Sequence, residues 1–333
     1  NFASSMANIA FFFPKAEKGN ALALNAGLGN LGVSVMQFLV PAVITTGVFG
    51  VLGGAPQTLS DGTQLFMQNA GFIWVPFILA ATALAWLGMN DIADAKASFR
   101  EQAIIFSRKQ NWLMCILYTG TFGSFIGYSA GFPLLTKLQF PEVNALQFVF
   151  LGPLVGALSR AGTGWISDRF GGGRVTLWTF AGMIIAVFGV ISFLPQGGEG
   201  GSFTGFFACF MALFFLTGVG NASTFQMIPA IMASEIPRLM PELDEASRRR
   251  QVERESAAII AFTSAVAAYG AFFIPKAYGT SIEMTGGPVA ALWGFLAFYV
   301  ICLVITWAAY TRPGGLLHAI ETRRAAPRAA HPA

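Results

Sequence analysis

Residues 144–167, with the sequence NALQFVFLGPLVGALSRAGTGWIS, contain a single charged side chain, that of Arg160. A helix needs about 20 apolar residues to cross the hydrocarbon core of a bilayer. Arg160 precedes Asp168, the next charge, by eight residues, or about 12 Å along a helix that rises 1.5 Å per residue. The stretch therefore predicts a membrane-spanning helix with a cation inside the bilayer.

The composition of the whole chain agrees with a membrane environment. Of 333 residues, 55% are hydrophobic and only 11% are charged, whereas soluble domains carry about a quarter charged residues. Cys115, Cys209 and Cys302 lie in apolar runs without metal-binding spacing, and both histidines lie near the C-terminus. We therefore expect no metal, no cofactor and no catalytic residue. The basic residues form no stripe with interleaved aromatics, which argues against binding of nucleic acid.

Further apolar runs are long enough to cross a bilayer. Because lipid offers no hydrogen-bond partner to an open strand edge, each is predicted to be a helix. The fold class that follows is an all-α polytopic membrane protein with eight full spans, preceded by a shorter apolar run over residues 1–13. The predicted spans are residues 20–48, 69–88, 111–136, 145–166, 175–194, 203–233, 256–275 and 288–310.

Lysines and arginines concentrate on one side of the predicted spans. If the connections alternate between two sides, starting with residues 14–19, only Lys137 and Lys276 of the 20 basic residues fall on the second side. Arg160 lies within a span, and all the others fall on the first side. Basic residues are enriched in cytoplasmic loops. The first side, which includes the C-terminus, is therefore predicted to be cytoplasmic.

Arg160 needs a partner, because a charge within the bilayer costs several kcal/mol unless it faces one or a water-filled cavity. No Asp or Glu lies within any predicted span. Three partners stay open: another part of the protein, backbone carbonyls that tie helices together, or a bound anion. A planar guanidinium with five donors suits a planar oxyanion, which it can bind through two parallel hydrogen bonds.

Aromatic and polar side chains near other span centres could line a cavity. Tyr118 and Phe122 are four residues apart and share one helix face, a pattern that also fits core packing. Asn221, Thr224 and Gln226 form a further polar patch in the span over residues 203–233. The patch alone does not distinguish helix packing from a substrate path.

Glycines and polar residues alternate over residues 25–37. Asn30 falls on one face with Ser34 and Gln37, and the glycines beside them leave the helix surface bare. This pattern fits tight helix packing or a smooth wall beside a substrate path. The glycines are Gly27, Gly29 and Gly32.

The connection over residues 164–174 contains Asp168, Arg169 and Gly171. Its glycines permit a tight turn. The two charged residues could pair with neighbouring helix ends in a gate, or could belong to a solvated turn.

This connection resembles the cytoplasmic Gly-x-x-x-Asp-Arg-x-Gly signature of the major facilitator superfamily. The chain resembles the bacterial nitrate/nitrite porter family more closely, over nearly its whole length and in order. The segments that carry this resemblance are NFASSMANIAFFFP (1–14), AGLGNLG (26–32), TFGSFIGYSAG (121–131), GALSR (156–160) and STFQMIP (223–229).

The resemblance implies a twelve-span fold of which this chain lacks the first three spans and most of the fourth. Residues 1–88 would then be the remainder of the N-terminal half, and residues 89–110 a central cytoplasmic loop. Residues 111–311 would form the C-terminal six-helix half, and residues 312–333 a disordered cytoplasmic tail. The implied setting is the bilayer of the bacterial inner membrane, with a monomeric protein that serves nitrate assimilation.

The resemblance also implies residue roles. Arg160 would be one of two substrate arginines, Phe2 and Phe122 would flank the anion, and Tyr118 would donate a hydrogen bond to it. Asn30 would lie near the site. The family's second glycine-rich signature falls on residues 261–271, where this chain keeps Gly270 and has alanine at three positions, Ala261, Ala267 and Ala271.

The function implied is alternating-access transport of nitrate and nitrite. Because no span carries an Asp, Glu or His that could hold a proton, we favour exchange of the two anions over proton symport. A facilitator for another small organic anion is the broader alternative. A membrane sensor or enzyme fits less well, since the residues after Arg312 form only a short tail and no nucleophile–base pair appears.

Overall fold

The computed structural model describes Ser5, Ile9, Phe12, Phe13 and residues 15–90, 102–195 and 200–325. Within these residues, eight helices are long and apolar enough to cross a membrane. They coincide with the eight predicted spans, and the prediction is confirmed. The N-terminal run over residues 1–13 falls almost entirely outside the described part.

The helices follow one another with short connections and one two-stranded hairpin. In the N-terminal part these are α2 (Lys15–Ile44), η1 (Gly50–Gly53), β1 (Gln57–Thr58), β2 (Gln64–Leu65), α3 (Asn69–Phe72) and α4 (Trp74–Gly88). Then come η3 (Ala103–Ser107), α6 (Lys109–Tyr118), the π-helical turn η4 (Thr119–Gly123), α7 (Ser124–Gln139) and η5 (Ala145–Gln147). The remainder comprises α8 (Leu151–Gly162), α9 (Gly164–Phe170), α10 (Gly172–Phe193), α11 (Phe203–Leu239), α12 (Glu245–Ala268), α13 (Gly270–Thr285), α14 (Val289–Ile305), η6 (Thr306–Thr311) and α15 (His318–Ala325).

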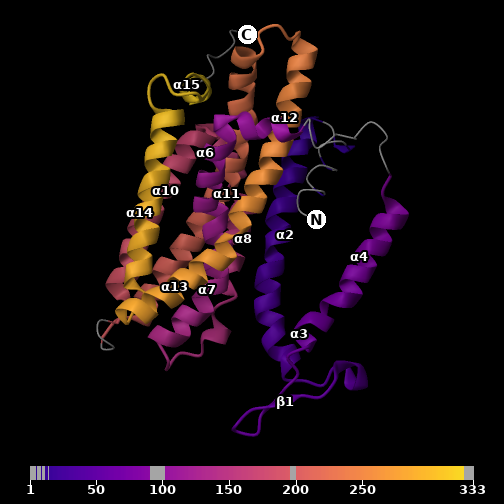
Figure 1. Cartoon of the computed structure of the whole chain (residues 1–333), viewed down its shortest axis with the longest axis vertical. Helices are drawn as coiled ribbons and strands as arrows, with labels where there is room; N and C mark the ends of the chain where they lie inside the picture. Colours follow the sequence, from indigo (N-terminus) through magenta and orange to yellow (C-terminus); the bar gives the residue numbers. More distant parts are fainter. Residues whose placement is uncertain are drawn as a thin grey trace, which may run out of the picture.

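The elements from α6 to α14 form one bundle, with α2 along its side and α4 standing apart (Figure 1). Aromatic side chains fill the bundle: the buried Phe132 ring contacts the buried rings of Phe206, Phe210 and Phe214. Such ring pairs contribute about 0.5–1.5 kcal/mol each beyond their buried area. The abundance of Phe thus builds the core that holds the site in place.

Helix α2 meets the bundle through side-chain hydrogen bonds. The Ser34 hydroxyl donates to the Phe150 carbonyl at 2.8 Å, and the Gln37 amide donates to the Ser129 carbonyl at 2.6 Å. Ser34 and Gln37 are three residues apart, so they lie on one helix face. The polar face that the sequence predicts for residues 30–37 is therefore turned toward the bundle.

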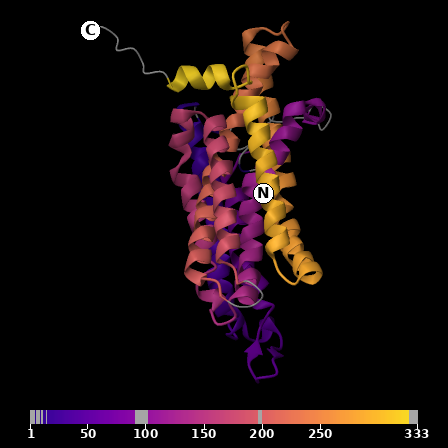
Figure 2. The same ribbon diagram turned by 90° about the vertical axis from the view of Figure 1, so that its left-hand side faces the viewer.

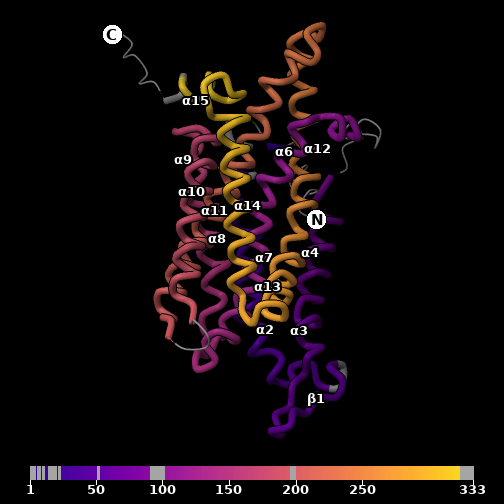
Figure 3. Tube along the Cα trace, turned by 60° about the vertical axis from the view of Figure 1, so that its left-hand side comes forward, coloured from indigo at the N-terminus to yellow at the C-terminus, as the bar shows by residue number. Residues whose placement is uncertain are grey.

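The predicted spans over residues 203–233 and 256–275 are shorter than the helices that contain them, which extend into the charged segment between the two spans. Helix α11 continues to Leu239 and α12 already begins at Glu245. Asp244 caps α12 by accepting the backbone N–H groups of Ala246 and Ser247 at 3.1 and 3.3 Å. The pKa of its carboxyl is lowered, first by the Ser247 side chain and then by these backbone bonds. The ends of both helices project beyond the bundle (Figures 2 and 3). Hydropathy detects only the apolar part of such helices.

The extension of α12 brings a carboxylate into the bundle. Glu255 is 1% exposed and accepts from Arg108 through Nε at 2.8 Å and Nη2 at 2.7 Å. Gln251 also donates to it, at 2.8 Å. This bidentate pair joins the start of α6 to α12 at one end of the bundle.

We expect Glu255→Ala to lower stability strongly, because removing one member of a buried ion pair leaves its partner uncompensated, at a cost of about 3–5 kcal/mol. The measurement is thermal unfolding in detergent. Glu253→Ala is the matched control, since Glu253 is exposed on the same helix. Replacing Arg108 and Glu255 together by Met should recover part of the loss. A Glu255→Ala protein that melts like the wild type would contradict this account.

The prediction of a disordered tail from residue 312 is wrong for α15. Glu321 on this helix is only 3% exposed and accepts the backbone N–H of Gly173 at 2.7 Å. Arg174 donates to the Thr322 hydroxyl at 3.1 Å. A carboxylate is favourable at the N-terminus of a helix, where unpaired N–H groups and the helix dipole attract it. This tertiary contact, which the local composition does not reveal, holds α15 on the start of α10.

Glu321→Ala should release α15, since a hydrogen bond to a charged group contributes about 1.5–3 kcal/mol. Hydrogen exchange should then rise over residues 318–325 and over the first turn of α10. Thr322→Ala, which removes only exposed hydrogen bonds with Arg174 and the His318 carbonyl, should change exchange much less. Equal protection of α15 in wild type and the Glu321 variant would show that the carboxylate does not hold the helix.

Candidate functional site

Arg160 lies in the last turn of α8 and is 3% exposed. Its Nη2 donates to the Tyr118 hydroxyl at 3.3 Å. Its guanidinium carbon lies 5.7 Å from the ring centre of Phe122 and 5.0 Å from that of Phe225. Aromatic faces attract cations, and so do the carbonyl groups at a helix C-terminus. These neighbours explain how the bundle tolerates the buried charge.

The aromatic residues around Arg160 also contact one another. Tyr118 and Phe122 stack with their ring centres 5.1 Å apart, and Phe225 meets Tyr118 edge-on at 4.8 Å. Tyr118 and Phe122 thus lie on one face, as their spacing indicates. The three rings form a wall beside the guanidinium, which we call the aromatic wall.

Phe122 is placed by the π-helical turn η4, which interrupts the helix between α6 and α7. Such turns occur frequently at functional sites. A Cβ atom added to Gly270 would collide with the backbone of Gly123 at the end of this turn. The methyl group of Ala267, one of the alanines in this segment, is fully buried. Gly270 therefore lets α13 touch the backbone of the turn that carries Phe122.

The glycines of α2 lie in two different environments. A Cβ added to Gly27 would lie 2.7 Å from the Cβ of Ala161, the residue after Arg160. A Cβ added to Gly29 or Gly32 would meet no described atom of another segment within 4 Å. Asn30 is half-buried, and its Nδ2 has no hydrogen-bond partner in the described part of the chain. The structure thus brings α2 to the backbone beside Arg160 at Gly27.

The residues of the predicted gate lie together on and after α9, at the end of the molecule that carries α15 (Figure 3). Asp168 is exposed, and the Arg169 guanidinium lies 5.4 Å from the Phe170 ring. Gly171 has φ +93°, a conformation that favours glycine. Phe2, predicted to flank the anion, lies outside the described residues.

One neighbour of Arg160, Phe225, is not among the candidates predicted from the sequence. Phe225 packs on Arg160, and its only sequence signal is its position next to the polar residues Thr224 and Gln226. Gln226 donates to the Gly164 carbonyl at 3.1 Å and so joins α11 to α9. Asn221, which belongs to the polar patch predicted from the sequence, is considered below.

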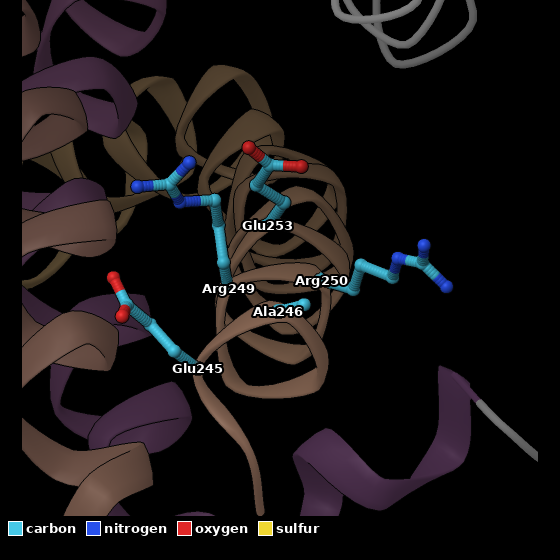
Figure 4. A pocket seen from close by; sticks show the side chains of 5 residues that line it. All are labelled: Glu245, Ala246, Arg249, Arg250 and Glu253. Atoms are coloured by element: carbon cyan, nitrogen blue, oxygen red, sulfur yellow. The ribbon is translucent and has the colours of Figure 1, made fainter.

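A shallow hollow at the start of α12 is a separate feature (Figure 4). It is lined by Glu245, Ala246, Arg249, Arg250 and Glu253. Acidic and basic side chains alternate there along an exposed helix end, so the hollow has no dominant charge. The arrangement fits a solvated surface rather than an anion site.

A family model for the Major Facilitator Superfamily matches residues 1–243. A solved structure of the fucose:proton symporter FucP of E. coli aligns with 91% of this chain and 72% of its own, at TM-score 0.55 and 13% identity, which shows a shared fold. The class is therefore the membrane transporters of the major facilitator fold.

Relatives at higher identity define the family within this class. The chain is 51% identical over 319 residues to "Nitrate/nitrite transporter NarU" of Salmonella typhimurium, covering 94% of this chain and 68% of the relative. NarU of Escherichia coli is 50% identical over the same shares. "Probable nitrate/nitrite antiporter NarK2" of Thermus thermophilus is 37% identical, again over 94% and 68%. The chain belongs to the nitrate/nitrite porter family of the major facilitator superfamily.

Proposed function

We propose that this chain carries one half of an anion site in a transporter that exchanges nitrate and nitrite across the bacterial inner membrane. The observation that carries the proposal is the buried Arg160 guanidinium against the aromatic wall. The names of its relatives, which describe nitrate/nitrite transporters and an antiporter, support the choice of substrate. The protein acts as a monomer in the bilayer.

The chemistry of the site suits a small planar oxyanion. Two parallel N–H groups of Arg160 bind two oxygens of nitrate or nitrite. Tyr118 accepts from Arg160, so its own hydroxyl hydrogen is available to donate to the anion. Phe122 and Phe225 exclude water, which strengthens these charged hydrogen bonds. Phe2, Asn30 and a second arginine complete the site in the proposed scheme.

Alternating access requires the two halves of the transporter to move against each other. In this scheme α2 to α4 belong to one half and α6 to α14 to the other. The contact of Gly27 with Ala161 then lies on the boundary between the halves, next to Arg160. The residues Asp168, Arg169 and Gly171 form part of the cytoplasmic gate.

The end of the molecule that carries α9, α15 and the start of α12 faces the cytoplasm in this proposal, which places the C-terminus there too. Its support is the concentration of lysines and arginines at that end, as in other cytoplasmic loops. Protease treatment of sealed inside-out vesicles should therefore cleave the tail after residue 325, whereas right-side-out vesicles should protect it.

A transport assay tests the proposed exchange. Proteoliposomes that hold the protein carrying this chain are loaded with nitrite, and uptake of labelled nitrate is measured. Exchange predicts rapid uptake into loaded vesicles and little into vesicles without an internal anion. Uptake driven by a proton gradient into vesicles without internal anion would show symport instead. Better transport of an organic anion than of nitrate would identify a facilitator for another substrate.

A further inference from the structure

Asn221 on α11 is a fully buried primary amide that the proposed mechanism does not use. Its side chain is 0% exposed, and neither Nδ2 nor Oδ1 has a hydrogen-bond partner among the described residues. Burying an unsatisfied polar group is costly, and native proteins pair more than about nine-tenths of them. A group of this kind needs a specific explanation.

The residues one turn before and one turn after Asn221 on α11 show which helix packs beside it. Gly218, one turn before, packs so closely that an added Cβ would lie 3.0 Å from the backbone nitrogen of Arg160 and would collide with Ser159. Phe225, one turn after, lies against the Arg160 guanidinium. The line from Gly218 to Phe225 therefore faces α8.

A second line on α11 faces the π-helical turn η4. A Cβ added to Gly220 would lie 2.5 Å from the methyl group of Thr121, and the Thr224 hydroxyl lies 3.4 Å from that of Thr121. Successive residues of an α-helix are about 100° apart around its axis. Asn221 therefore lies between the line that faces α8 and the line that faces η4. Helix geometry thus directs Asn221 toward the region between α8, which carries Arg160, and η4, which carries Phe122.

We propose that Asn221 is a further substrate-binding residue, whose Nδ2–H donates to an oxygen of the oxyanion that Arg160 holds. The inference rests on the proposed transport of nitrate and nitrite. A neutral amide adds a directional hydrogen bond without a second charge, and an oxyanion has more acceptor sites than one guanidinium fills. The bound anion would supply the acceptor that Nδ2 lacks among the described residues.

Asn111 provides a matched control. It is also 0% exposed, and both of its amide atoms lack partners in the described part of the chain. It lies on α6 seven residues before Tyr118, which is about 10 Å along the helix. Asn111→Leu therefore measures the effect of removing a buried amide away from the aromatic wall.

The test compares nitrate transport by wild type, Asn221→Leu, Asn221→Asp and Asn111→Leu in proteoliposomes, with melting temperatures measured on the same preparations. Asn221→Leu should raise KM for nitrate about tenfold or more, the effect expected when a hydrogen bond to a charged group is lost. Asn221→Asp keeps the shape but places a carboxylate beside the anion, so it should raise KM further. Asn111→Leu should leave KM within about twofold of wild type.

Two sets of KM values would overturn the inference. If Asn221→Leu and Asn221→Asp keep the wild-type KM, or if Asn111→Leu raises KM as much, Asn221 does not bind the anion. If Asn221→Leu does not fold, the isosteric Asp variant decides. If the wild type transports nitrate and the Asn221 variants have the same KM, this inference alone is wrong. If the wild type transports neither nitrate nor nitrite, the proposed function is wrong as well.

Discussion

Arg160→Lys should abolish most nitrate transport, although it keeps the positive charge. Lysine offers a compact ammonium group in place of the planar fork, so the parallel pair of hydrogen bonds to the oxyanion is lost, together with stacking on Phe122 and Phe225. Charged hydrogen bonds contribute about 1.5–3 kcal/mol each, which corresponds to a loss in Vmax/KM of about 100-fold. Initial rates of labelled nitrate uptake measure the effect.

Arg249→Lys is the matched control for this change, because Arg249 is exposed at the start of α12 (Figure 4). It should transport nitrate at the wild-type rate. Wild-type transport by Arg160→Lys would rule out bidentate binding and would favour a point-charge site, such as one for a different anion.

Gly270→Ala should reduce both transport and stability. The added methyl group has no room, since it would occupy the position of the Gly123 backbone. Because backbone cannot move aside like a flexible side chain, α13 and the turn η4 must separate, at a cost of about 1–3 kcal/mol. Phe122 lies on that turn and would shift relative to Arg160. A displacement of about 1 Å in a binding site can reduce the rate about 100-fold.

Gly279→Ala on the same helix separates this effect from helix propensity. Gly279 has no neighbour within 4 Å among the described residues, so the methyl group meets open space. Alanine should leave transport unchanged there, and its higher helix propensity should stabilise α13 slightly. Transport by Gly270→Ala equal to that of Gly279→Ala would show that close contact at Gly270 does not position the site.

The spans and the buried arginine could be predicted from sequence for the same reason. In lipid, a helix satisfies its own backbone, so an apolar run of sufficient length determines its structure locally. A charge in such a run is conspicuous, and Arg160 was found because the rest of residues 144–167 is uncharged. The pairing of Tyr118 and Phe122 also followed from spacing on one helix.

The remaining features depend on contacts between distant segments. The docking of α15 requires Glu321 to meet Gly173, 148 residues away. The inward position of Glu255 requires Arg108 on another helix. Phe225 lies against Arg160 only because α11 packs against both α8 and η4. No periodicity within one segment reveals such contacts, although the polar patch beside Phe225 gave a partial signal.

A structure of the protein in complex with nitrate would show whether Arg160 binds the anion. We predict a planar anion within hydrogen-bond distance of two Arg160 nitrogens and of the Tyr118 hydroxyl, flanked by the Phe122 and Phe225 rings. Nitrate bound elsewhere, with Arg160 still held by protein groups alone, would contradict it.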